Sequence, residues 1–196
     1  MASSRGKIYT RRGDQGQTRL LSGERVTKDD ARVKTYGALD ELQAHIGMAL
    51  CFTRLDTVRL LLGAVQEDIV VASSELASSP EAALQLGRRI GRGDVVRLEQ
   101  WIDELTTSYS LPERFVRPGT SADSAAVHVA RAVCRRCERL IVTLNRQAGG
   151  YDDLLVYFNR LSDFLFVVAW SLEVNAVLER IVGQSLARTA KEGSSQ

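Results

Sequence analysis

The stretch ADSAAVHVARAVCRRCERLIVTL, at residues 122–144, has the apolar spacing of one long helix with a wide buried face. Its apolar positions recur every three or four residues: Ala126, Val129, Ala130, Val133, Cys134, Cys137, Leu140, Ile141 and Leu144. A polar stripe remains at spacings i, i+3, i+7 and i+10: His128, Arg131, Arg135 and Glu138. Because burying an unpaired charge is costly, we expect these arginines to be solvated, to be paired, or to bind an anion.

The composition indicates an ordinary globular chain. Its 196 residues suit one domain, 1–196, and 44% of them are apolar and 26% charged. The net charge of +2 argues against a nucleic-acid binder, and no uninterrupted apolar run reaches the ~18 residues of a membrane span. We therefore expect no nucleic-acid or membrane partner. Too few residues precede Ile8 for a signal or transit peptide, so a cytoplasmic location is expected, with a mature mitochondrial form as the alternative.

Three cysteines, Cys51, Cys134 and Cys137, are an odd and low number that favours a reducing compartment over a disulfide scaffold. The CxxC pair lies within the expected helix at 122–144, without a second CxxC or a nearby pair of histidines. We expect buried apolar cysteines there and not a metal or redox site. The isolated histidines His45 and His128 are expected to be structural.

Four other segments have helical spacing, at about 31–50, 56–79, 93–109 and 152–182. They predict an all-α fold, a five-helix up-down bundle with a four-helix core, preceded by a short strand and loop. The connection at 81–93 is expected to be exposed, and residues 183–196 to be a disordered polar tail. On the last helix, Asn159, Ser162 and Asp163 form a polar cluster that needs partners, which the antiparallel helix at 122–144 can supply.

The N-terminal segment 1–27 contains KIYTRRGDQGQTRLL at 7–21, which begins with the β-prone pair Ile8–Tyr9. The glycine-bearing loop that follows could present backbone N–H groups to a phosphate, but it is not a Walker A loop, and taken alone this segment is better interpreted as a floppy terminus. Lys28 is either a phosphate contact or a surface lysine. Phe115, on a loop framed by two prolines, either packs on the core or projects into a ligand pocket.

Five segments together resemble the PduO-type ATP:cob(I)alamin adenosyltransferases. They are IYTRRGDQGQT at 8–18, KDDARVKTYGALDEL at 28–42, RFVRPG at 114–119, RAVCRRCER at 131–139 and YFNRLSDFLFVVA at 157–169. Arg12 stands where that family usually has Thr in TRTGDxGxT, and Cys137 where it usually has Ala. Arg117 and Thr120 depart from the usual loop sequence, which puts the corrinoid-side contacts of this loop in question, as Arg12 does for the phosphate contacts.

The resemblance implies a ferritin-like bundle that forms a homotrimer, binds ATP between subunits and transfers its 5′-deoxyadenosyl group to cob(I)alamin, releasing triphosphate. Mg²⁺ would be held through the ATP phosphates. Arg135 would contact the triphosphate, Arg131 would pair with Asp40 of an adjacent subunit, and Phe115 would lie against the lower face of the corrin; Arg135, Phe115 and Asp40 form the expected catalytic set. The expected ATP-binding residues are Thr10, Gly13, Asp14, Gly16, Thr18, Lys28, Arg131, Arg135, Glu138 and Asn159.

Further expected partners are a flavin-dependent reductase and an enzyme that uses adenosylcobalamin. One alternative is a non-catalytic carrier of ATP or cobalamin on the same bundle, but the presence of Arg135, Asn159 and Phe115 favours the enzyme. Another alternative, a structural bundle or a basic-helix nucleic-acid binder, predicts an excess of positive charge, which the net charge of +2 opposes.

Overall fold

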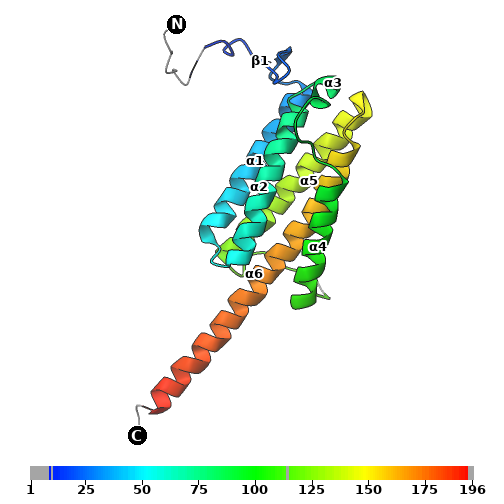
Figure 1. The fold of residues 1–196 in the computed structure, drawn as a ribbon. Coiled ribbons are helices and arrows are strands. Elements are labelled where there is room, and N and C mark those ends of the chain that lie inside the picture. The colour runs from blue at the N-terminus through cyan, green and yellow to red at the C-terminus, as the bar shows by residue number, and fades with distance from the viewer. Residues whose placement is uncertain (1–8, 10, 114, 194–196) are drawn as a thin grey trace.

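A β-hairpin and six helices make up the part of the chain described by the computed structural model: residues 9, 11–113 and 115–193, without the side chains of Pro80 and 189–193 (Figure 1). The elements are β1 (Gln17–Arg19), β2 (Arg25–Thr27), α1 (Ala31–Phe52), α2 (Asp56–Leu76), α3 (Pro80–Ala83), α4 (Arg92–Ser108), α5 (Ala122–Ala148) and α6 (Asp152–Gly193). The predicted all-α bundle is confirmed, with the single turn α3 as an additional helix.

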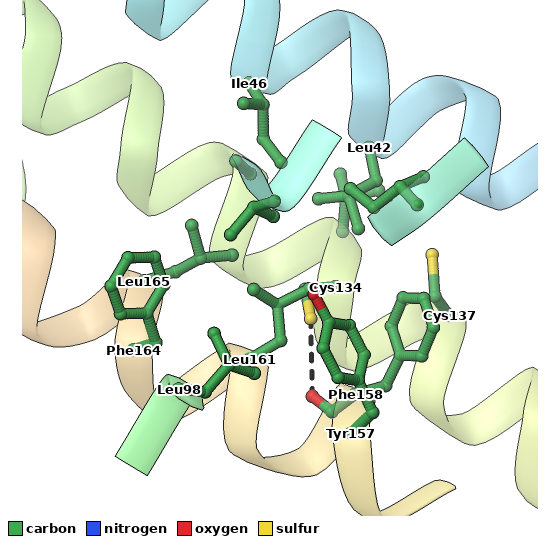
Figure 2. Close-up of a cluster of buried hydrophobic side chains, with 14 of the residues drawn as sticks. Leu42, Ile46, Leu98, Cys134, Cys137, Tyr157, Phe158, Leu161, Phe164 and Leu165 are labelled. Carbon is green, nitrogen blue, oxygen red and sulfur yellow. Dashed lines mark hydrogen bonds between the residues drawn. The ribbon is translucent and has the colours of Figure 1, made fainter. Parts of the chain in front are cut away.

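Helix α5 lies at the centre of the packing, as its wide apolar face predicts. It packs against α1 and α6, while α2 packs on α1 and α4 on α6. Leu42 and Ile46 from α1, Leu98 from α4 and Phe158 from α6 meet α5 in one core (Figure 2). Helix α5 is therefore surrounded over much of its girth, although Val129, which the sequence placed on the apolar face, is 42% exposed.

The turn between α5 and α6 is built from glycine and asparagine. Gly149 and Gly150 have φ of 70° and 82°, in the left-handed region that glycine tolerates best. The Asn145 side-chain amide donates to Asp152 at 2.7 Å, and its oxygen accepts from the Tyr151 backbone N–H at 2.9 Å. These contacts hold α5 and α6 antiparallel, as the sequence predicted.

The N-terminal strand lies later in the chain than predicted. Ile8 is outside the described residues, and Tyr9 is in no strand. The hairpin instead follows the glycine loop, with Gln17 opposite Thr27 and Arg19 opposite Arg25. Its turn is closed because the Gly23 N–H donates to Leu20 at 2.9 Å and Gly23 adopts a φ of 86°.

The connection before α4 is anchored, and the prediction that residues 81–93 form an exposed loop was wrong in part. Glu75 of α2 is only 2% exposed, and its carboxylate accepts from the Ile90 N–H at 2.6 Å and the Arg89 guanidinium at 3.1 Å. Ile90 is itself buried in the core. The many arginines of this stretch predicted solvent exposure. Its hydropathy could not show that a buried carboxylate, Glu75, comes from a different helix and holds it in place.

A second buried carboxylate, Asp68, joins α2 to α4 and α6. It accepts from Arg88 at 2.7 Å, Arg97 at 2.5 Å and the Tyr157 hydroxyl at 2.9 Å. Tyr157 is fully buried, and burial beside Asp68 raises the pKa of its hydroxyl well above the usual value. The bonds satisfy a charge that would otherwise be very unfavourable inside the bundle.

Helix α6 continues to Gly193, so the prediction of a non-helical tail from residue 183 was wrong for residues 183–193. This segment has no proline and is rich in residues that tolerate a helix, so the backbone hydrogen-bonding pattern continues past the bundle (Figure 1). By length and hydropathy, Asp152–Arg188 is one helix that could cross a membrane, but 56% of its most apolar window is buried inside the bundle. The first half of α6 is thus a core helix of the bundle.

The two cysteines of α5 are buried thiols, as predicted. Cys134 donates to the Phe158 carbonyl at 3.5 Å (Figure 2), and Cys137 to the Ala38 carbonyl at 3.2 Å. Burial raises the pKa of Cys137 to about 12, and that of Cys134 well above its usual value. Neither thiol is available as a thiolate nucleophile near neutral pH.

We therefore expect Cys134→Ala combined with Cys137→Ala to leave the protein folded and active, with a free energy of unfolding lower by about 1–3 kcal/mol because sulfur volume is lost from the core. Denaturant titration and a steady-state rate measure the two effects. The exposed thiol variant Cys51→Ala is the matched control and should change neither. Loss of activity in a folded double variant would contradict the structural role and restore a thiol function.

Candidate functional site

The glycine loop and Lys28 form a basic hollow at one end of the bundle. Gly16 has a φ of 75°, which favours glycine, and its carbonyl accepts from the Lys28 backbone N–H at 2.8 Å. A Cβ at Gly13 would lie 3.3 Å from the Lys28 Nζ, so the ammonium group rests directly on the loop. The hollow has a volume of about 630 Å³ and is lined by Arg12, Gly13, Gln17, Thr18, Arg19, Arg25 and Lys28.

Of the loop residues expected to bind phosphate, Gly13, Thr18 and Lys28 thus lie together, and Gly16 shapes the turn. Asp14 is exposed beside them, and its backbone N–H donates to the Arg11 carbonyl at 3.4 Å. Thr10 lies outside the described residues. The prediction of a floppy terminus does not hold for the segment from Gly13 onward, because this segment is fastened to the hairpin.

The hairpin is fixed to the bundle at two points. Leu20 is buried, and the Leu21 N–H donates to the Ala77 carbonyl after α2 at 2.7 Å. Glu24 accepts two bonds of 2.9 Å from the Arg32 guanidinium, a bidentate ion pair with α1. The basic hollow is therefore held in a defined position relative to α1 and α2.

The edge of α5 that faces α6 carries the predicted arginine stripe. Arg131 lies over the Phe166 ring, 5.9 Å from its centroid, and its buried Nε has no hydrogen-bond partner among the described residues. Arg135, one turn further on, is exposed. Glu138 accepts from the Asn159 side-chain amide of α6 at 3.1 Å, which confirms that α5 supplies a partner to the polar cluster of α6.

The other polar edge of α5 faces α1. Arg136 forms an ion pair with Glu41, while Asp40 beside it is exposed and lines a separate hollow of about 520 Å³ between α1 and α2. No ion pair joins Arg131 to Asp40 within the described residues of one chain. The predicted pairing of these two residues between subunits remains a prediction.

His128 is buried and structural within the chain, as expected. Its Nε2 lies 3.3 Å from Glu173, which also accepts from the Ser124 hydroxyl at 2.8 Å. Burial lowers the pKa of His128, while the Glu173 carboxylate opposes this shift. His45 lies 4.0 Å from the Glu41 carboxylate, and no group of three or more potential metal ligands occurs among the described residues.

Phe115 does not pack on the core, which excludes the first of the two interpretations that the sequence left open. Its side chain is fully exposed to solvent. The loop that carries it is fastened at its start, where the Trp170 indole N–H donates to the Ser110 carbonyl at 2.8 Å. An aromatic ring held in solvent on an anchored loop is suited to contact a large apolar ligand.

The three groups of candidate residues are ordered along the bundle axis (Figure 1). The hairpin lies at the start of α1, and the loop that carries Phe115 enters α5 at the opposite end. Arg135 lies between them. The contact between Cys137 and Ala38 places Arg135, two residues earlier on the antiparallel α5, beside the tenth residue of α1. At 1.5 Å per residue, this position is about 15 Å from the hairpin end of the bundle. Arg135 is not among the residues that line the basic hollow of the glycine loop.

Two residues of the basic hollow, Arg19 and Arg25, were not predicted from the sequence. Each lies on a three-residue strand, too short for a clear alternating pattern. The signal that could have identified them was their proximity to the glycine loop on either side of the Gly23 turn. They add two cations to the site formed by the loop and Lys28.

Comparison with known proteins gives a consistent family assignment. The sequence profile described as cobalamin adenosyltransferase matches residues 8–172. A corrinoid adenosyltransferase of Citrobacter freundii is 42% identical over 163 residues, covering 83% of this chain and 93% of that protein. The PduO corrinoid adenosyltransferase of Salmonella typhimurium is 36% identical over 175 residues; the match covers 89% of this chain but 52% of that longer protein.

Solved structures agree with the sequence comparison. A phenylalanine-to-alanine variant of the PduO-type ATP:corrinoid adenosyltransferase of Lactobacillus reuteri, complexed with cobalamin and ATP, superimposes with a TM-score of 0.80 at 32% identity, covering 86% of this chain and 94% of that one. An arginine-to-lysine variant of that enzyme, complexed with ATP, gives a TM-score of 0.78 at 32% identity, covering 85% and 94%. The chain belongs to the cobalamin adenosyltransferase family.

Proposed function

We propose that this protein is an ATP:cob(I)alamin adenosyltransferase, which transfers the 5′-deoxyadenosyl group of ATP to cobalt and releases triphosphate. The observation that carries the proposal is the order of its candidate residues along the bundle: a basic hollow, then Arg135, then the exposed Phe115. The basic hollow and Arg135 suit the phosphates of a nucleotide, and the exposed Phe115 suits a corrin; because these groups are separated along one bundle, neighbouring subunits would bring them together around one ATP.

The chemistry needs no protein nucleophile, and the chain is consistent with this. Cob(I)alamin is itself a strong nucleophile that attacks C5′, and the electrons of the C5′–O bond leave with the triphosphate. The α5 thiols are buried and protonated, and His128 is enclosed by Glu173 and Ser124. The role of the protein is thus to orient the reactants and to stabilise the leaving group.

Charge accumulates on the triphosphate as it leaves, so cations placed along it lower the barrier. Lys28 and the loop N–H groups would bind one part of the chain, while Arg135, supported by the Glu138–Asn159 pair, would bind another. Mg²⁺ commonly binds through phosphates with only one or two carboxylates and several waters, and the lack of a cluster of potential ligands among the described residues fits that mode.

Phe115 is assigned to the corrinoid side. A ring against the lower face of the corrin would exclude water or a base from the lower axial position of cobalt. Losing that ligand makes Co(II) easier to reduce, in line with the general control of a metal by axial ligation and local dielectric. Its full exposure within one chain means that it is free to make such a contact.

ATP is proposed to bind between subunits of a homotrimer. Arg135 does not line the basic hollow of its own chain, and the buried Arg131 Nε lacks a hydrogen-bond partner among the described residues. Asp40 of a neighbouring subunit would supply that partner. A separated monomer would then be inactive although folded. A cytoplasmic location, a flavin-dependent reductase and an adenosylcobalamin-using enzyme complete the proposal.

The direct test is an anaerobic assay of the purified protein with ATP, Mg²⁺ and chemically reduced cobalamin, followed by the absorption spectrum of adenosylcobalamin. Formation of adenosylcobalamin together with one triphosphate per turnover is the expected result. Binding of both substrates without product would favour the carrier instead, and absence of binding would contradict both functions.

A further inference from the structure

A buried polar cluster joins the first turns of α5 to α6, and the proposed chemistry makes no use of it. The Glu173 carboxylate of α6 accepts from the Ser124 hydroxyl at 2.8 Å, and the His128 Nε2 lies 3.3 Å from the same oxygen. Ser124 is fully buried, and His128 and Glu173 are 6% and 5% exposed. Replacing buried charged groups with apolar ones of similar volume is often neutral or stabilising. Stability alone therefore does not account for this cluster.

The carboxylate fixes the ring of His128. Burial lowers the pKa of His128, the nearby Arg131 charge adds to this shift, and the Glu173 carboxylate opposes it without cancelling it. The neutral imidazole therefore prevails near pH 7, and its one N–H lies on Nε2, where the carboxylate accepts it. The Nδ1 atom is buried and has no hydrogen-bond partner among the described residues. The ring thus has one polar anchor, and packing determines the rest of its position.

Phe166 of α6 lies beside both His128 and Arg131. Its ring centroid is 6.4 Å from that of His128, and the two rings are inclined at 61° in an edge-on arrangement. The Arg131 Cζ lies over the same Phe166 ring, 5.9 Å from the centroid. His128 and Arg131 are three residues apart and so are neighbours on one face of α5. Because Phe166 is only partly buried, its contact with His128 restricts a ring that the core does not fully enclose.

Arg131 depends on that ring for its position. Its buried Nε has no hydrogen-bond partner, and no ion pair involves it, among the residues that the structure describes. An arginine side chain has many rotamers, so an attractive contact with an aromatic face decides which of them is occupied. Contacts thus run without a gap from the buried cluster, through the Phe166 ring, to the Arg131 guanidinium.

We infer that His128 is a positioning residue that acts on Arg131 through the Phe166 ring. The buried carboxylate of Glu173 holds the imidazole in place for this role. The inference rests on the proposed function, in which Arg131 contacts ATP and the Asp40 carboxylate of a neighbouring subunit. With the imidazole absent, the Phe166 ring would turn into the vacated space. The Arg131 guanidinium would then leave the position from which it makes those contacts.

The first measurement is structural and needs no substrate. A crystal structure of His128→Ala is expected to show the Phe166 ring turned and the Arg131 guanidinium no longer over its face. Glu173→Gln is the conservative comparison, because its amide oxygen still accepts from Ser124 and His128, and Arg131 should keep its place. An Arg131 guanidinium that stays over the ring in His128→Ala would overturn the inference, whatever the activity of the protein.

The second measurement separates positioning from stability. The KM for ATP of His128→Ala is expected to rise about tenfold with a smaller change in kcat, because a charge-assisted contact to bound ATP is lost. Glu173→Gln should have a KM close to that of wild type. Leu144→Ala, near the opposite end of α5, removes buried volume and should lower the thermal midpoint without raising the KM. A KM that rises equally in Leu144→Ala would overturn the positioning role.

A double-variant cycle tests the route through Arg131. In an Arg131→Met background, the further change His128→Ala should leave the KM for ATP unchanged, because residues that act through one another are not additive. An equal rise in that background would refute the route. The proposed function fails separately: displacement of Arg131 in the His128→Ala structure, together with no adenosylcobalamin from the wild-type protein, refutes the transferase and leaves the positioning of Arg131 intact.

Discussion

Arg135→Ala is expected to lower the rate of adenosylcobalamin formation by roughly 10²–10³-fold, the range found when one preorganised donor to a developing negative charge is removed. Arg135 is exposed on the polar edge of α5, with no ion pair to any described residue, so its guanidinium is free to contact the triphosphate. The loss should fall on kcat more than on the KM for ATP, because charge on the leaving group is greatest in the transition state.

The controls for Arg135 separate catalysis from stability. Arg146→Ala removes an exposed arginine from the last turn of the same helix and should cost a few tenths of a kcal/mol of stability at most, without a large effect on the rate. Arg135→Lys keeps the charge and should recover part of the activity. Circular dichroism and the thermal midpoint of Arg135→Ala should match wild type. An unchanged steady-state rate in that variant would refute the assigned contact.

The helices could be predicted because their apolar periodicity is local and strong. Residues 122–144 gave both the central position of α5 and the burial of Cys134 and Cys137, since a helix apolar over most of its girth must have neighbours on several sides. The antiparallel turn followed from Gly149 and Gly150 and was likewise confirmed. These properties depend on residues within a few turns of one another.

What the sequence did not give depends on contacts distant in the chain. The burial of Ile90 requires Glu75 of another helix, and the Asp68 network gathers α2, α4 and α6. The hairpin register, which places Arg19 opposite Arg25, likewise depends on pairing between separate strands. The end of α6 was misplaced because nothing past the bundle terminates the helix. The ion pairs and hydrogen bonds of charged residues could not be predicted, because the positions of their partners follow no periodic sequence pattern.

The candidate functional site shows the same division between features that are local in sequence and contacts that are distant. The residues of the glycine loop, Lys28, Arg135 and Asn159 came from a resemblance of motifs, and the structure places them in two groups separated along the bundle. We propose that a second chain joins the groups, and the motifs of one chain cannot position that second chain. The subunit contact through Arg131 and Asp40 therefore remains a prediction, and the unpartnered buried Nε of Arg131 is the observation that favours it.

Phe115→Ala is expected to slow adenosylation that starts from cob(II)alamin by roughly 10–100-fold, the range found when groups surrounding a metal centre are removed. The affinity for ATP should change little, because the loop that carries Phe115 enters α5 at the end of the bundle opposite the hairpin. Its side chain is fully exposed, so the thermal midpoint of the free protein should not fall. A large kinetic effect without a stability effect is what a ligand contact predicts and a core residue does not.

The measurement compares two starting states of cobalt. With a mild reductant and cob(II)alamin, the variant should be slow, because the lower axial position is no longer shielded. With cobalamin reduced chemically to Co(I) in advance, the rate should recover largely, since the shielding acts before the transfer step. Leu111→Ala, another half-exposed apolar residue of the same loop, is the matched control and should behave as wild type. Equal losses from both starting states would place Phe115 in the transfer step itself, and equal losses of ATP binding and reduction would exclude the role of Phe115 at the lower face.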